Sequence, residues 1–222
     1  MSVLNALDSL IAKIDDSKEG LSSSDVKCVD LTSNFKWFNA PTTFDVKPNK
    51  LSMTCEYNTD LWQTPDINRD SGHFFYTTIE GNFISYVKIT GEYDKMYDQI
   101  GIMIRKDIKN WVKCGIEYID VQNVSAVVTK TYSDWNLARL DSNPKSIYIK
   151  LSRDKAKIMV EYSLDNNKYY LLRKFQFFDS KLQIGLMGCS PKRANNDKKF
   201  KCLFENFVLI KTDSNVKDPC QD

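Results

Sequence analysis

The chain has 222 residues, the length of one large domain or two small ones. Its 31 Lys and Arg against 29 Asp and Glu give a formal net charge of +2, with 42% hydrophobic and 27% charged residues. This near-neutral composition excludes a strongly electropositive nucleic-acid binder, a polyacidic tail and a disordered chain. No uncharged apolar stretch approaches the roughly 18 residues of a membrane span. We therefore expect neither a nucleic-acid nor a membrane partner.

Residues 1–25 are predicted to form one short amphipathic helix followed by a Ser- and Gly-containing linker. The apolar residues that recur at helical spacing are Leu4, Leu7, Ile11 and Ile14. No basic region precedes them, and Asp8 interrupts them, which is unlike a signal peptide. We therefore expect a cytoplasmic protein. The helix is expected to dock on the rest of its own chain, with a groove on a partner as the alternative.

Six cysteines occur in the chain: Cys28, Cys55, Cys114, Cys189, Cys202 and Cys220. None of them forms a C-x-x-C pair, so the sequence supports neither a zinc site nor a thioredoxin-like motif. In a reducing compartment free buried thiols are favoured over disulfides, which remain the alternative.

After residue 25 the hydrophobic pattern changes to a period of two, which is typical of β-strands. About twelve strands are predicted, with turn signals and no helical pattern between them: 26–31, 50–57, 72–79, 83–90, 99–105, 110–120, 124–131, 146–153, 157–163, 168–178, 181–189 and 200–211. This regular spacing favours a β-sandwich over residues 26–211, with residues 212–222 as a C-terminal tail.

Strand alternation separates an aliphatic face from a polar one. The predicted core residues are Ile100, Ile102, Ile104, Val112, Ile116, Ile149, Ile184 and Leu186. The opposite faces of the same strands carry Gln, Met, Arg, Trp, Lys, Glu and Tyr, together with Gly101, Gly115 and Gly185. Rings among amides and charges are typical of a sugar-binding platform, and the glycines would let a ligand approach closely. The alternative is an ordinary solvated sheet face whose glycines only curve the sheet.

Catalytic chemistry has little support in the sequence. His73 is the only histidine and begins an apolar strand, so a structural role is expected. Glu117 and Asp120 lie three residues apart on one strand and point to opposite faces, so Glu117 could pair only with an acid from elsewhere, such as Asp98 or Asp134. No calcium-loop or phosphate-loop motif occurs. We therefore predict no catalytic site, no metal and no cofactor.

Several strings occur together in a specific order: Y-D-Q-I-G-I-M-I-R at 97–105, W-V-K-C-G-I-E at 111–117, S-D-W at 133–135, I-G-L-M-G-C-S-P at 184–191 and F-E-N-F at 204–207. In that order and spacing they resemble the regulation-of-enolase family, a set of domains of unknown function. The resemblance runs from about Phe35 to Lys211. One departure is Asn166, which stands where members often have Gly in a turn, and Asn tolerates positive φ there.

The resemblance implies an all-β fold, a concanavalin A-like jelly-roll β-sandwich of two curved antiparallel sheets. It also implies a cytosolic role in regulating enolase and carbon metabolism, with no established enzymatic activity or cofactor. The family motif residues fall on the polar sheet face, and we predict a ligand-binding face made by Asp98, Gln99, Arg105, Trp111, Lys113, Glu117, Asp134 and Trp135, with Ser133 beside them.

The function expected from the sequence is therefore a non-catalytic regulator that acts by binding, with enolase or another cytosolic protein as its partner. The alternative is a lectin-like carbohydrate-binding module, and a glycoside hydrolase is the third choice. Six of the face residues are predicted to converge on one concavity: Gln99, Arg105, Trp111, Lys113, Glu117 and Trp135. Within it, Lys113 and Glu117 could pair with Asp98 and Arg105.

Overall fold

The computed structural model of the chain describes residues 28–177 and 181–212. The predicted N-terminal helix and the tail beyond Thr212 lie outside these residues. In the described part the secondary structure consists of strands, and no helix there is long and apolar enough to span a membrane. The strands are β1 (Lys36–Phe38), β2 (Thr43–Lys47), β3 (Lys50–Cys55), β4 (Leu61–Gln63), β5 (Asn68–Asp70), β6 (His73–Glu80), β7 (Asn82–Gly91), β8 (Gln99–Asp107), β9 (Asn110–Ile119), β10 (Val121–Lys130), β11 (Tyr132–Arg139), β12 (Ile147–Asp154), β13 (Lys157–Ser163), β14 (Tyr170–Gln176), β15 (Lys181–Cys189) and β16 (Phe200–Thr212).

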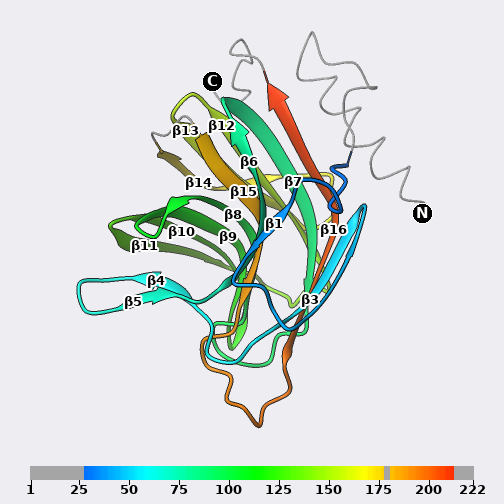
Figure 1. Cartoon of the computed structure of the whole chain (residues 1–222), viewed down its shortest axis with the longest axis vertical. Helices are drawn as coiled ribbons and strands as arrows, with labels where there is room; N and C mark the ends of the chain where they lie inside the picture. Colours follow the sequence, from blue (N-terminus) through cyan, green and yellow to red (C-terminus); the bar gives the residue numbers. More distant parts are fainter. Residues whose placement is uncertain (1–27, 178–180, 213–222) are drawn as a thin grey trace.

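Two seven-stranded antiparallel sheets pack face to face (Figure 1). The first, called here the front sheet, has the order β1-β6-β15-β8-β9-β10-β11. The second, the back sheet, has the order β14-β13-β12-β7-β16-β3-β2. Strands β4 and β5 form a separate hairpin beside β11 at the lower left of Figure 1. The all-β prediction with two antiparallel sheets is thereby confirmed.

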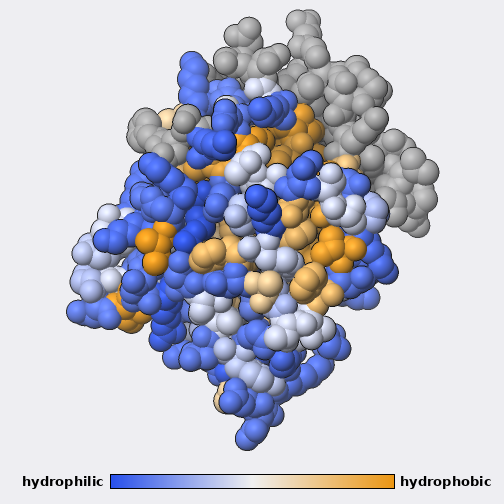
Figure 2. Space-filling view, in the orientation of Figure 1, coloured by the Kyte–Doolittle hydropathy of each residue, from blue (hydrophilic) through white to orange (hydrophobic). Residues whose placement is uncertain are grey.

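The hydrophobic core lies between the two sheets, and the strand alternation explains its composition. All eight predicted core residues are in it, each exposing 2% or less of its surface. Aromatic residues close one region of the core, where Phe35 stacks on Phe75 with ring centroids 5.1 Å apart. The face of the molecule in Figure 2 is mainly hydrophilic, and its hydrophobic residues lie in small separate groups.

Some predicted elements differ from the observed ones. The expected strand over 26–31 is seen only as an isolated bridge between Cys28 and Val208 in the described residues. Strands β1, β2, β4, β5 and β11 were not predicted. The thiols of Cys28, Cys55, Cys114, Cys189 and Cys202 are free, as expected, while Cys220 lies outside the described residues.

Candidate functional site

The outer face of the front sheet is buried over much of its area, because the β4–β5 hairpin covers it. Beneath the hairpin is a second apolar cluster of Leu61, Phe74, Met103, Trp111, Val127, Met187 and Cys189. Leu61 comes from the hairpin itself, and the other six come from the sheet. This part of the sheet face is therefore a covered layer and not the open, solvated surface considered from the sequence.

A pocket of about 250 Å³ lies between the hairpin and the front sheet. The buried residues that β8 and β9 supply to it are Gln99, Lys113 and Glu117, and its aromatic residues are Trp62, Tyr97 and Trp135. Asp60, Ile67, Arg69, Pro191 and Lys192 complete the lining. The structure thus brings four of the predicted face residues, Gln99, Lys113, Glu117 and Trp135, into one concavity.

Lys113 connects the sheet to the hairpin. Its residue is 4% exposed, and its Nζ donates to the carbonyl oxygen of Leu61 at 2.8 Å and to Oε1 of Gln99 at 2.6 Å. The Asp60 carboxylate lies 3.9 Å from the same nitrogen and pairs with Arg69 at 3.2 Å. A charge buried this deeply requires such partners. Lys113 therefore fixes the hairpin's position over the sheet.

Glu117 and Trp135 are held together across the sheet. Oε2 of Glu117 accepts hydrogen bonds from Nε1 of Trp135 and from Oγ of Ser125, both at 2.8 Å. Strand β10 lies between them, since it pairs with β9 on one side and β11 on the other. The indole N–H is thus turned toward the sheet, and Trp135 remains 40% exposed.

Two aromatic rings stand beside Trp135. Trp62 of β4 and Tyr97 each meet its ring edge to face, with ring centroids 6.2 Å apart in both pairs. Tyr97 has a φ of 68°, a left-handed conformation that is costly for an aromatic residue. Its N–H donates to the carbonyl oxygen of Tyr118 at 2.7 Å, which helps to hold it there.

Asp98 does not line the pocket. It is fully buried and pairs with the Arg193 guanidinium, with Oδ2 2.6 Å from Nη2 and Oδ1 3.0 Å from Nε. Oδ1 also accepts from Oγ of Ser190, and Oδ2 accepts from the N–H groups of Asp94 and Lys95. Asp98 therefore ties together the two loops that supply Tyr97 and Lys192 to the pocket, and it acts as a positioning residue.

Arg105 and Trp111 lie on the predicted face but away from the pocket. Arg105 makes a two-pronged ion pair with Asp70 of β5 at 2.7 and 2.8 Å and lies 4.5 Å from the centroid of the Phe38 ring. Trp111 is fully buried in the second apolar cluster, and its Nε1 donates to the carbonyl oxygen of Ile108 at 3.0 Å. Trp111 therefore offers no ring face to a ligand, and Arg105 is engaged with the hairpin.

Asp134 points to the opposite side of β11 from Trp135. Its carboxylate pairs with Nη2 of Arg173 at 2.6 Å, on strand β14 of the back sheet. The neighbouring Ser133 Oγ accepts from the N–H of Gln63 in the hairpin at 3.0 Å. Asp134 thus helps to close the edge of the sandwich. The predicted pairing of Lys113 and Glu117 with Asp98 and Arg105 is not formed.

The glycines of this face serve the packing of the strands and do not admit a ligand. A Cβ on Gly101 would lie 1.9 Å from the backbone oxygen of Cys114, and one on Gly115 would lie 2.0 Å from that of Ile100. The two glycines are paired directly across β8 and β9. A Cβ on Gly185 would likewise meet the Phe75 oxygen at 2.0 Å. The expectation that these positions leave room for a ligand is therefore wrong.

The pocket residues that sequence reasoning missed are Asp60, Trp62, Ile67, Arg69, Tyr97, Pro191 and Lys192. Trp62 and Arg69 lie on two three-residue strands, which are too short for an alternation pattern, and Asp60 and Ile67 directly precede these strands. The available signal was Trp62 beside a Pro–Asp turn sequence, which favours a loop that carries function.

The cysteines and the histidine in the described part of the chain are poorly suited to nucleophilic or metal chemistry. Burial is the main cause that raises the pKa of the Cys55, Cys114, Cys189 and Cys202 thiols, which makes them poor nucleophiles. Nδ1 of His73 lies 2.6 Å from the Asn39 carbonyl oxygen, and Nε2 accepts from the N–H of Glu56 at 3.0 Å. Within residues 28–177 and 181–212 no group of three His, Cys, Asp or Glu is arranged for a metal ion.

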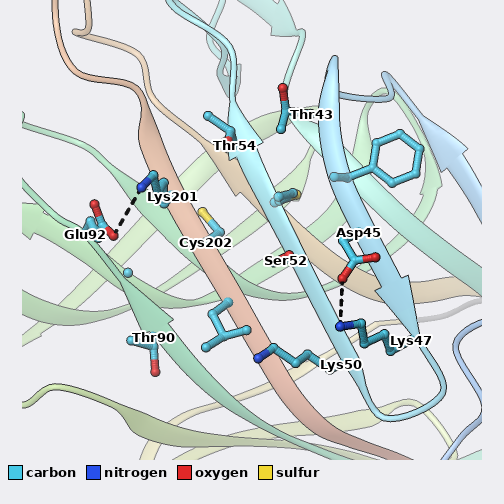
Figure 3. A pocket seen from close by; sticks show the side chains of 14 residues that line it. Thr43, Asp45, Lys47, Lys50, Ser52, Thr54, Thr90, Glu92, Lys201 and Cys202 are labelled. Atoms are coloured by element: carbon cyan, nitrogen blue, oxygen red, sulfur yellow. Dashed lines mark ion pairs between the residues drawn. The ribbon is translucent and has the colours of Figure 1, made fainter.

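A larger hollow of about 460 Å³ lies on the outer face of the back sheet, between β2, β3, β7 and β16 (Figure 3). Its ion pairs, Lys47 with Asp45 at 3.4 Å and Lys201 with Glu92 at 3.8 Å, are between exposed side chains. Hydroxyl groups of Thr and Ser line the strands between them. Ion pairs between exposed side chains contribute little free energy, because water already solvates both charges. The smaller front-sheet pocket is therefore the better candidate site.

Comparison with known proteins places the chain in a family. The model of the family described as "Protein of unknown function (DUF1349)" matches residues 37–210, the greater part of the chain. The chain belongs to this family. Among curated proteins, Regulation of enolase protein 1 of Saccharomyces cerevisiae is 32% identical over 161 residues, which are 71% of this chain and 81% of that protein. The resemblance to the regulation-of-enolase family is thus confirmed.

Two solved structures share the fold of this chain. A functionally unknown protein from Saccharomyces cerevisiae superposes with a TM-score of 0.77 at 29% identity, covering 83% of this chain and 99% of the other. The GH43 BlXynB protein from Bacillus licheniformis superposes with a TM-score of 0.64 at 13% identity, covering 89% of this chain and 39% of that one. At this identity the second likeness shows the fold alone.

Proposed function

We propose that this protein is a non-catalytic cytosolic regulator that acts by binding, and that the front-sheet pocket is where it binds. The observation that carries the proposal is that the charged groups of the pocket are held in place by hydrogen bonds within the protein. Lys113 is bonded to Gln99 and Leu61, and Glu117 to Trp135 and Ser125. Groups preorganised in this way suit recognition, because their geometry is set before a ligand arrives.

The regulatory part of the proposal rests on the relative named Regulation of enolase protein 1. Enolase is accordingly the partner we propose, and the effect would be on its activity. The exposed apolar part of the pocket, Trp135 at 40% and Ile67 at 40%, supports contact with a partner, since aromatic anchors dominate protein interfaces.

A direct binding experiment tests this proposal. The full-length protein is mixed with enolase purified from the source organism, and association is measured by sedimentation velocity beside the enolase rate. We expect a complex and a change in rate, both weakened at least about tenfold by Trp135→Ala. The control is Glu80→Gln, an exposed surface position outside the pocket. Absence of a complex, together with an unchanged enolase rate, would overturn the proposal.

The sequence-based alternative, a lectin-like module, differs in what fills the same pocket. Its support is the combination of a polar base with three aromatic rings, an arrangement suited to sugar rings. A regulator and a sugar-binding module are one mechanism when sugar occupancy alters the surface offered to the partner.

A further inference from the structure

We infer that the pocket binds one neutral saccharide ring through two neighbouring hydroxyls, held by Gln99, Lys113 and Glu117 against the Trp135 wall. The inference rests on one part of the proposed function, that this pocket is the binding site. It names the small ligand for the form of that function in which sugar occupancy alters the surface offered to the partner.

Each of the three buried residues has hydrogen-bonding capacity that the protein does not use. The Lys113 ammonium has three N–H donors, and the hydrogen bonds to Leu61 and Gln99 occupy two. The Asp60 carboxylate lies 3.9 Å from the same nitrogen, which is an ion-pair distance but beyond hydrogen-bonding distance. Oε2 of Glu117 accepts both of that carboxylate's hydrogen bonds, so Oε1 accepts none from the residues the structure describes. These groups lie on residues that are only 4–6% exposed and open onto the pocket.

The orientation of the Gln99 amide is fixed by its neighbour. Lys113 can only donate, so the atom it meets at 2.6 Å must be the amide oxygen. The NH₂ group of Gln99 therefore faces the other way, and within residues 28–177 and 181–212 it finds no acceptor. Gln99 pairs directly with Glu117 across β8 and β9, so their side chains stand next to each other on the same face.

The pocket thus presents three hydrogen-bonding groups side by side: the Gln99 amide as a donor, Glu117 Oε1 as an acceptor and the Lys113 ammonium as a charged donor. A hydroxyl can donate to Glu117 Oε1 while it accepts from the Gln99 amide, and a neighbouring hydroxyl can accept from Lys113. An anion would meet the Glu117 carboxylate, and a cation would meet Lys113. Adjacent hydroxyls on a neutral molecule use all three groups and oppose neither charge.

The size and the walls of the pocket select a ring. Pockets for drug-sized ligands enclose roughly 300–1,000 Å³, so about 250 Å³ suits a single sugar ring. The Trp135 N–H is already bonded to Glu117, which leaves the indole face for C–H groups of a ligand. Trp62 and Tyr97 brace that ring from two sides. A saccharide has the required combination of apolar C–H groups and adjacent hydroxyls.

The test uses the full-length protein and a panel of methyl glycosides: the glucoside, galactoside, mannoside and xyloside. Binding is followed by tryptophan fluorescence and by calorimetry, with tetrahydropyran as the ring that lacks hydroxyls. We expect at least one glycoside to bind with a Kd on the order of 1 mM or tighter, and tetrahydropyran not to bind. If every glycoside fails to bind in the tens-of-millimolar range, the inference is wrong.

Two near-isosteric variants test the assigned atoms. Glu117→Gln keeps an oxygen for Trp135 and Ser125 but replaces the free acceptor with a donor. Gln99→Glu keeps an oxygen for Lys113 but removes the free donor. Each should weaken glycoside binding at least about tenfold in protein whose circular dichroism shows an intact fold, while Glu80→Gln binds normally. Binding unchanged in both folded variants would overturn the assignment.

The outcomes separate this inference from the proposed function. Glycoside binding without an enolase complex would contradict the regulator proposal and leave the saccharide inference standing. An enolase complex that is sensitive to Trp135→Ala, with no glycoside bound, would do the reverse.

Discussion

Gly101 and Gly115 show at the scale of single residues how closely β8 and β9 approach each other. They are opposite each other in the ladder, and each lacks the Cβ that would overlap the other strand's backbone. A backbone oxygen cannot rotate away as a side chain can, so the close approach depends on glycine.

Gly101→Ala is therefore expected to lower the free energy of unfolding by about 3 kcal/mol, measured by urea denaturation. The matched control is Gly188→Ala, where the added Cβ would meet the side-chain ends of Met53 and Cys55 and not the backbone. We expect a smaller loss there because a methionine end can move. Equal losses at the two positions would contradict the backbone argument.

His73 predicts a pH dependence of stability. Burial is the main cause that lowers its pKa below the usual value of about 6.5. Protonation would also remove the Nε2 acceptor for the N–H of Glu56. The unfolded chain therefore binds a proton at His73 more readily than the folded chain does. The contribution of neutral His73 to the free energy of unfolding is fully present above about pH 6.5. It is lost as the pH falls through the lower pKa of the folded state.

Denaturant titrations between pH 5 and pH 8 check this prediction, with His73→Gln as the comparison. As the chain has one histidine, the slope in this window should flatten in the variant. Glu56 acts in a separate window, because its hydrogen bond with Thr42 is the largest cause that lowers its pKa, to about 2. A slope that is identical in both proteins would rule out His73 as its source.

At the scale of elements, the β4–β5 hairpin depends on a few polar contacts. Arg105 to Asp70, Lys113 to the Leu61 oxygen, and the Gln63 N–H to Ser133 attach it to three different strands of the front sheet. Between these contacts the second apolar cluster is sealed from water. The hairpin and the pocket therefore form together.

Asp70→Asn should loosen this hairpin. It leaves the Arg105 side chain, which is 7% exposed, without its counter-charge, and we expect a loss of about 2–3 kcal/mol. Hydrogen exchange should quicken at the hairpin amides, residues 61–70. The control Asp45→Asn removes an exposed pair with Lys47 and should change stability by less than about 0.5 kcal/mol. Protection unchanged in Asp70→Asn would show that the pair does not hold the hairpin.

The fold was largely predictable from the sequence, and the site was predictable in part, for reasons visible in particular elements. Strands β8, β9 and β15 were assigned correctly because hydrophobic residues, mostly isoleucine, leucine and valine, occupy alternate positions along them. The same alternation placed Lys113 and Glu117 on a common face. It could not show that the hairpin crosses that face, since three-residue strands carry no periodic signal.

Burial explains the remaining errors at the site. Alternation assigned Trp111 to an open polar face, but the covering hairpin turns its surroundings into an apolar cluster. Asp98 and Asp134 were expected on the binding face, as acids that could pair with Glu117, yet they pair with Arg193 and Arg173, which lie 95 and 39 residues away in the chain. Such long-range pairs depend on sheet topology, which local patterns do not specify.

At the scale of the whole molecule, two sheets and one covering hairpin build a pocket on a scaffold that resembles part of a GH43 protein. That likeness shows a fold and carries no chemistry. A glycosidase needs one carboxylic acid that holds a proton and a second carboxylate on the other side of the bond. In this pocket the two acids are Asp60 and Glu117.

We expect no turnover of p-nitrophenyl β-glucoside or β-xyloside above the buffer rate, because both acids are engaged as acceptors. Glu117 receives two donors on one oxygen, and Asp60 lies against Arg69 and also accepts from the N–H of Leu61. Neither arrangement leaves a protonated acid directed at a leaving group. The opposite result would be that the unchanged protein and Glu80→Gln both release p-nitrophenol and Glu117→Gln does not. That result would show that the pocket reacts with sugars and does not only bind them.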